Sequence, residues 1–186
     1  ESEAELGRVD AIAKEISKPA RISIRVNPNV DPKTHPYIST GLKDNKFGVN
    51  EKKAISMYKI AKGLDSIEIK GIDCHIGSQI TELKPFEDSI KKLLELIDHL
   101  KSLGILIDNI DVGGGIGIQY SEELPPTFSE YSKIVKNVLK GRNLKIIFEP
   151  GRALIGKAGI LLTKVEYVKN SSDKNFLIVN AAMNDL

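Results

Sequence analysis

The stretch Ile107–Ile118, IDNIDVGGGIGI, decides the fold because a run with β-branched residues at positions 107, 110 and 112 passes directly into three glycines. The first six residues predict a strand, Ile107–Val112, which ends at the glycines. Before it, Pro85–Leu103 repeats apolar residues at spacings of three and four, which predicts a helix. Pro85 suits the first turn of that helix, and Gly104 suits its end. A helix followed by such a strand is typical of a parallel sheet with helical crossovers.

The same alternation extends along the chain in both directions. The other predicted elements are strands at 21–26, 66–76 and 145–148 and helices at 51–64 and 128–139. Between the first strand and the first helix, residues 27–48 contain three prolines and predict a long ordered loop, which is uncommon unless functional. The fold class is therefore α/β.

The pattern changes after Gly151, where no further helix is predicted. Residues 153–169 and 175–182 are expected to be extended, joined by the turn-like residues 170–173. We therefore predict an α/β part over residues 1–152 and the start of a β domain over 153–186. The 186 residues are short for a complete (β/α)₈ barrel, which takes about 250.

Composition excludes several functional classes. Lys and Arg number 27 against 25 Asp and Glu, without a basic block, which argues against nucleic acid or a membrane surface as partner. No apolar run approaches the ~20 residues of a membrane span. The single cysteine, Cys74, excludes an internal disulfide, and the three histidines lack the spacing of a metal site. No signal peptide is visible, so we expect a cytoplasmic location.

The chemically unusual residues follow the predicted strands. They are Asn27, His75, Gly113–Gly115 and Glu149–Arg152. In parallel α/β folds, and in barrels above all, the carboxyl edge of the strands carries the active site. Four consecutive strands with this feature are stronger support for a site than any single motif.

The three glycines leave backbone N–H groups accessible to an anion, so we favour a phosphate site over a plain turn. The dinucleotide pattern G-x-G-x-x-G does not fit, because Ile118 or Tyr120 stands where its last glycine is required. No Gly-Lys-Ser/Thr follows either, so the Walker A pattern also fails.

The sequence EPGR at residues 149–152 forms a compact corner with two charged groups. Glu149 could hold a protonated ring nitrogen and Arg152 a phosphate or carboxylate. Taken in isolation, the motif is better explained as a surface turn with a salt bridge, because four-residue motifs are common. His75 could stack on a planar ligand or move a proton, and Ser78 could donate to phosphate. The alternative for His75 is a core histidine bonded to a carbonyl.

Five motifs in order point to a known family. They are residues 21–49 (RISIRVNPNVDPKTHPYISTGLKDNKFGV), 74–80 (CHIGSQI), 112–118 (VGGGIGI), 149–152 (EPGR) and 180–186 (NAAMNDL). With them the chain resembles the diaminopimelate decarboxylase family, fold-type III enzymes that use pyridoxal 5'-phosphate (PLP). The resemblance implies part of an alanine racemase-like PLP-binding (β/α)₈ TIM barrel leading into a β domain. It also implies a carboxy-lyase of lysine biosynthesis that acts on an amino acid as a homodimer.

The resemblance assigns roles to the matching residues. His75 would stack on the PLP ring, Glu149 would pair with the pyridine nitrogen, and both count as catalytic. Arg152 would bind a substrate carboxylate near the phosphate, with Arg25 in support. The remaining expected cofactor-binding residues are Ser78, Gly113, Gly114, Gly115, Pro150 and Gly151.

The chain departs from the family at two residues. Asp73 stands where the family usually has His, and Asn180 where it usually has Asp. The lysine that binds PLP covalently and the last substrate residues match no position here, so we expect the segment alone to be inactive. A relative acting on ornithine, arginine or carboxynorspermidine, and a non-catalytic PLP- or phosphate-binding module, remain the alternatives.

Overall fold

The computed structural model describes residues 1–31 and 46–185, which form two compact units. The first unit is Glu1–Leu154 and the second is Ile155–Leu186. Most of the predicted loop at residues 27–48 lies outside the described residues.

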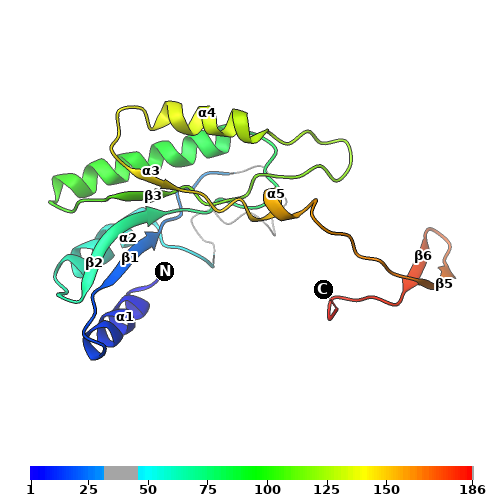
Figure 1. The fold of residues 1–186 in the computed structure, drawn as a ribbon, viewed down its shortest axis with the longest axis horizontal. Coiled ribbons are helices and arrows are strands. Elements are labelled where there is room, and N and C mark those ends of the chain that lie inside the picture. The colour runs from blue at the N-terminus through cyan, green and yellow to red at the C-terminus, as the bar shows by residue number, and fades with distance from the viewer. Residues whose placement is uncertain (32–45, 186) are drawn as a thin grey trace. The chain divides into compact units, whose positions relative to one another are not determined.

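A four-stranded parallel sheet forms the centre of the first unit (Figure 1). Its strands, in spatial and chain order, are β1 (Ala20–Arg25), β2 (Ile67–Asp73), β3 (Asn109–Asp111) and β4 (Lys145–Ile147). The connecting helices are α2 (Glu51–Lys62), α3 (Lys84–Ser102) and α4 (Phe128–Val138). Each predicted strand and helix of this unit is confirmed, with its ends within three residues of the expectation. A further helix, α1 (Glu3–Glu15), precedes β1 and was not predicted.

Local sequence sets the helix boundaries. The side chain of Asn50 accepts a hydrogen bond from the backbone N–H of Lys53 and caps α2. Thr127 and Glu130 form a reciprocal capping box at the start of α4. Such caps satisfy backbone groups that the first helical turn leaves without partners.

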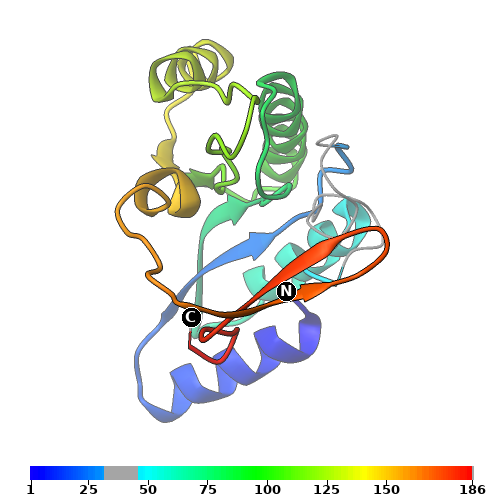
Figure 2. The same cartoon turned by 90° about the vertical axis from the view of Figure 1, so that its right-hand side faces the viewer.

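The hydrophobic core lies between the sheet and the helices α2, α3 and α4 (Figure 2). Ile24, Ile72 and Ile110 are register partners on three neighbouring strands, and all three are buried in this core. Because side chains alternate along a strand, the residues between them project from the opposite face. That face carries Ser23, Arg25, Gly71, Asp73, Asn109 and Asp111 in register. A largely polar sheet face is unusual for a barrel interior, which branched apolar residues normally fill.

The second unit contains an antiparallel hairpin of β5 (Val165–Asn170) and β6 (Asn175–Val179). The expectation that residues 153–169 are extended throughout is wrong, because a short helix, α5 (Gly151–Ile155), begins directly after Pro150. The backbone N–H of Leu154 bonds to the Pro150 carbonyl and closes this turn. The apolar side chains of Leu154 and Ile155 suggested a strand, but proline fixes a φ angle that suits a helix start.

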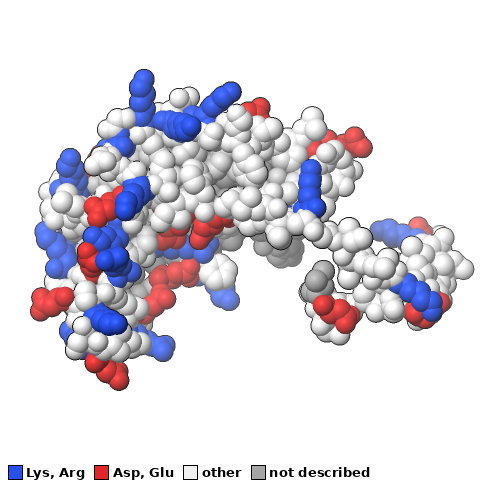
Figure 3. Space-filling view, viewed as in Figure 1, with Lys and Arg blue, Asp and Glu red and all other residues white. Residues whose placement is uncertain are grey.

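The charge on one face of the molecule agrees with the composition. On the face that Figure 3 shows, basic and acidic side chains are interspersed. No helix among the described residues combines the length and apolar character needed to span a bilayer.

Candidate active site

The sheet register brings the predicted site residues to one edge. The last row of paired strand residues consists of Arg25, Asp73, Asp111 and Ile147. Two residues beyond each member of this row stand Asn27, His75, Gly113 and Glu149, which we call the strand-end row. Backbone hydrogen bonds continue the pairing past the strands, for example from Glu149 N–H to the Gly113 carbonyl at 2.9 Å. The prediction that these residues share the carboxyl edge is therefore confirmed by geometry.

The three glycines lie where neighbouring strand-end loops approach each other most closely. A Cβ atom on Gly113 would lie 2.3 Å from the Cys74 carbonyl oxygen, and one on Gly115 would lie 2.2 Å from that of Gly77. On Gly114 it would lie 2.0 Å from the Glu149 carbonyl oxygen. Real Cβ contacts are never this short, so close backbone packing requires glycine at all three positions.

Two of the glycine amides bond to side chains of the site. Gly113 N–H donates to Oδ1 of Asp111 at 2.9 Å, and Gly114 N–H donates to Nδ1 of His75 at 3.3 Å. His75 is half-buried. Its burial lowers the pKa of the imidazole, the Arg25 cation lowers it further, and Asp111 opposes both effects. The lowered pKa favours the neutral form of the ring.

Sequence reasoning did not single out Gln79, which joins the loops after β2, β3 and β4. Its side chain bonds to both the N–H and the carbonyl of Ile118. Arg152 donates from Nη1 to Oε1 of Gln79 at 3.4 Å, and its guanidinium lies 6.0 Å from the centre of the Tyr120 ring. Arg152 therefore lies against the turn that carries Ser78. The available signal was the position of Gln79 next to Ser78 in the HIGSQ motif.

The edge also gathers carboxyl groups. Burial raises the pKa of Asp73 to about 6, the charge of Asp111 adds to the increase, and Arg25 opposes it. Burial likewise raises the pKa of Asp111, against the hydrogen bond from Gly113. Glu149 is exposed at the end of β4. Within residues 1–31 and 46–185, no three His, Cys, Asp or Glu side chains form a group that could hold a metal.

The chemistry of these groups fits PLP. A half-buried neutral imidazole suits an aromatic ring, and a carboxylate suits a protonated ring nitrogen, as His75 and Glu149 would provide. A hydroxyl, a backbone amide and a guanidinium suit a phosphate, as Ser78, Gly115 in the glycine-rich loop and Arg152 would provide. These five groups lie on the segments that follow β2, β3 and β4, at one edge of the sheet.

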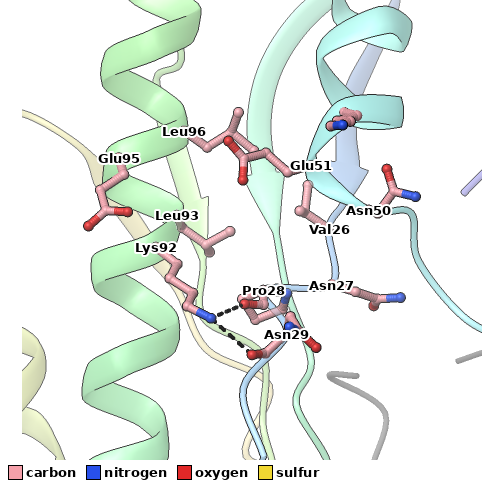
Figure 4. A pocket seen from close by; sticks show the side chains of 11 residues that line it. Val26, Asn27, Pro28, Asn29, Asn50, Glu51, Lys92, Leu93, Glu95 and Leu96 are labelled. Carbon is pink, nitrogen blue, oxygen red and sulfur yellow. Dashed lines mark hydrogen bonds between the residues drawn. The ribbon is translucent and has the colours of Figure 1, made fainter. Parts of the chain in front are cut away.

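A separate pocket of about 550 Å³ lies between α2, α3 and the segment after β1 (Figure 4). The ammonium group of Lys92 projects into it and donates to the carbonyls of Pro28 and Asn29 at 2.8 and 2.9 Å. Asn27 is the member of the strand-end row that lines this pocket, and His75 and Glu149 do not. The pocket is thus distinct from the predicted PLP site.

Comparisons with known proteins show the family of the chain and its fold. The sequence profile of the family described as "Pyridoxal-dependent decarboxylase, pyridoxal binding domain" matches residues 1–156. Diaminopimelate decarboxylase of Vibrio cholerae is 54% identical over 187 residues, covering 100% of this chain and 45% of that protein. The corresponding Pseudomonas aeruginosa protein is 50% identical with the same coverage. The chain thus spans about 45% of the length of the curated relatives it matches.

Solved structures give the same result. Helicobacter pylori diaminopimelate decarboxylase, complexed with L-lysine, matches with a TM-score of 0.90 and 46% identity over 100% of this chain and 46% of that one. Diaminopimelate decarboxylase from M. jannaschi matches with a TM-score of 0.84 and 38% identity over 99% of this chain and 44% of that one. The resemblance to diaminopimelate decarboxylases and the partial PLP-barrel fold are confirmed. The chain belongs to the pyridoxal-dependent decarboxylases, and residues 1–156 are part of their pyridoxal-binding domain.

Proposed function

We propose that the gene product containing this chain decarboxylates meso-2,6-diaminopimelate to L-lysine and CO₂ with PLP as cofactor. The observation that carries the proposal is the similarity to diaminopimelate decarboxylases at about half identity over the entire chain. A related structure contains L-lysine, which would be the product of this reaction. The cytoplasmic location and the homodimer expected from the sequence remain predictions of the same proposal.

In this proposal the strand-end loops hold the cofactor. His75 presents the flat face of a neutral ring, because Gly114 engages its Nδ1 atom. Ser78, Gly115 and the backbone at Gly151 bind the phosphate, while Gly113 and Gly114 shape the loop. Pro150 fixes the chain between Glu149 and the start of α5, so that these groups face one ligand.

Glu149 and Arg152 have different roles in this proposal, one toward the cofactor and one toward the substrate. When bound, PLP supplies an electron sink for the electron pair left at Cα as CO₂ departs. Glu149 keeps a proton on the pyridine nitrogen, which strengthens that sink. The guanidinium of Arg152 binds a substrate carboxylate through a bidentate pair of hydrogen bonds and so orients the substrate.

A substrate panel tests the proposal. The gene product, loaded with PLP, is incubated separately with meso-diaminopimelate, ornithine, arginine and carboxynorspermidine, and CO₂ and amine products are measured. We expect L-lysine from diaminopimelate with the highest kcat/KM. Absence of CO₂ from diaminopimelate would reject the proposal, turnover of another member would assign the related decarboxylase, and PLP binding without any turnover would indicate a passive module.

Residues 1–186 alone are expected to bind no PLP covalently and to release no CO₂. None of their lysines matches the cofactor lysine of the family, and Lys46 matches a different position. Borohydride reduction of a mixture with PLP, followed by peptide mass spectrometry, tests this. Cofactor fixed on one specific lysine would contradict the expectation.

A further inference from the structure

One hydrogen bond in the strand-end row constrains the protonation of His75. The backbone N–H of Gly114 donates to Nδ1 of His75 at 3.3 Å. A ring nitrogen accepts a hydrogen bond only when it carries no proton. Nδ1 is therefore unprotonated in this arrangement, and the proton of the neutral ring resides on Nε2.

The donor is held in place from both sides. Gly113, the preceding residue, donates to Asp111 through its N–H and accepts from Glu149 N–H at its carbonyl, each at 2.9 Å. The Glu149 carbonyl oxygen lies so close to Gly114 that a Cβ atom there would be 2.0 Å away. The amide of Gly114 therefore cannot turn away from His75 without moving the loop after β4.

Two charged groups on the neighbouring strands act on the imidazole, Arg25 from β1 and Asp111 from β3. Two further carboxyl groups stand close in the register, Asp73 on β2 and Glu149 after β4. Burial and Arg25 disfavour a cationic ring, and Asp111 favours it. The first two effects prevail, which agrees with the acceptor role of Nδ1.

We propose that Gly114 is a positioning residue that fixes His75 as the neutral tautomer with its proton on Nε2. This role of Gly114 rests on the proposed function, in which His75 is the residue that faces the PLP ring. If Glu149 keeps that ring protonated, a cationic His75 against it would repel the cofactor. The hydrogen bond to Gly114 prevents this, since protonation of Nδ1 must first break it.

Two variants of His75 separate the Nδ1 contact from the presence of a polar side chain. His75→Asn places a carboxamide oxygen near the position of Nδ1, so it can still accept from Gly114. His75→Gln places its amide near the position of Nε2 and leaves the Gly114 amide without an acceptor. Amide hydrogen exchange of Gly114 is measured by NMR in the PLP-free gene product and in both variants.

We expect protection at Gly114 in the wild type and in His75→Asn, and exchange at least tenfold faster in His75→Gln. The amide of Gly117, which donates to the Ile80 carbonyl at 3.0 Å, is the internal control and should stay protected in all three proteins. Equal exchange at Gly114 in the two variants, or no protection in the wild type, would overturn the proposal.

Nitrogen-15 spectra of the histidine rings in the wild-type protein give an independent readout of the tautomer. The His75 signals, assigned by their absence in His75→Gln, should show a pyridine-like Nδ1 and a pyrrole-like Nε2 at pH 7. A protonated Nδ1 would contradict the proposal. Lysine formation from diaminopimelate together with a protonated Nδ1 rejects the Gly114 role alone, whereas the expected tautomer without lysine formation rejects the proposed function alone.

Discussion

Asp73 on β2 and Asp111 on β3 are register partners at the carboxyl edge of the sheet. Neighbouring strands lie about 4.8 Å apart, and paired residues project from the same face, so the two carboxyl groups repel each other. Arg25 on β1 pairs with Asp73 and provides compensating charge on one side. Burial and this repulsion together raise the pKa of Asp73 to about 6.

Replacement of Asp73 by Asn should therefore stabilise the protein at neutral pH. A carboxyl group with a pKa of about 6 when folded and about 3.9 when unfolded binds more protons in the folded state between these values. Its contribution to stability thus falls as pH rises from about 4 to 6, by up to about 3 kcal/mol. In urea unfolding, Asp73→Asn should have a higher free energy of unfolding than the wild type at pH 8, and the difference should disappear near pH 4.

Asp65→Asn is the control for that experiment, because Asp65 is exposed in the turn after α2. It should change the free energy of unfolding by less than about 0.5 kcal/mol at either pH. A destabilised Asp73→Asn at pH 8 would instead indicate that the ionised carboxylate is required to pair with Arg25.

Alanine at Gly113 should destabilise the protein more than alanine at Gly141. Both glycines have positive φ, +68° and +79°, so both substitutions strain the backbone. A Cβ on Gly113 would also meet the Cys74 carbonyl at 2.3 Å, whereas Gly141 has open space. We expect a cost of about 1 kcal/mol at Gly141 and more than about 3 kcal/mol at Gly113 in denaturant unfolding. Equal costs would show that the loops do not pack as closely as the structure indicates.

Removal of the Tyr58 hydroxyl should weaken the attachment of α2 to the sheet. The fully buried Tyr58 donates from its hydroxyl to the Gly71 carbonyl in β2 at 2.7 Å, and burial raises the pKa of this tyrosine. Tyr58→Phe should cost about 1–2 kcal/mol, seen as a lower urea midpoint with an unchanged m-value. Tyr120→Phe, at a 66% exposed ring, should have almost no effect, and a similar loss in both variants would contradict the assignment.

Lysine at position 152 should keep the positive charge but lose the planar fork. Arg152→Lys is therefore expected to raise KM for the amino-acid substrate about tenfold, equivalent to about 1.4 kcal/mol. The PLP absorption titration of the same variant shows whether the cofactor is affected as well. Arg8→Lys, on an exposed position of α1, is the matched control. If Arg152→Lys keeps the wild-type KM, Arg152 does not bind the substrate.

Much of the fold could be predicted because its signals are local. The 3.6-residue period of α3 and the β-branched runs before His75 and Gly113 needed no tertiary information. Helix α1 escaped prediction because its apolar residues are few and its stability depends on contacts with β1 and α2. Helix α5 escaped because five residues carry too little periodic signal to outweigh the strand preference of Leu154 and Ile155.

The site could be located but not built from sequence. Strand ends placed His75, Gly113 and Glu149 at one edge, because parallel strands share a direction. Register could not be predicted, so the pairing of Asp73 with Asp111 and the contact of Gly114 with His75 emerged only in three dimensions. The glycines suggested an anion site, whereas the structure gives them a second reason, the close packing of three loops.

A crystal structure of the gene product with PLP and L-lysine is the most direct test of the central claim, that the strand-end row holds the cofactor of a diaminopimelate decarboxylase. We predict the pyridine ring against His75, its nitrogen within hydrogen-bond distance of Glu149, and the phosphate on the loops carrying Ser78 and Gly115. Cofactor bound elsewhere, or with its phosphate directed at Glu149, would contradict this claim.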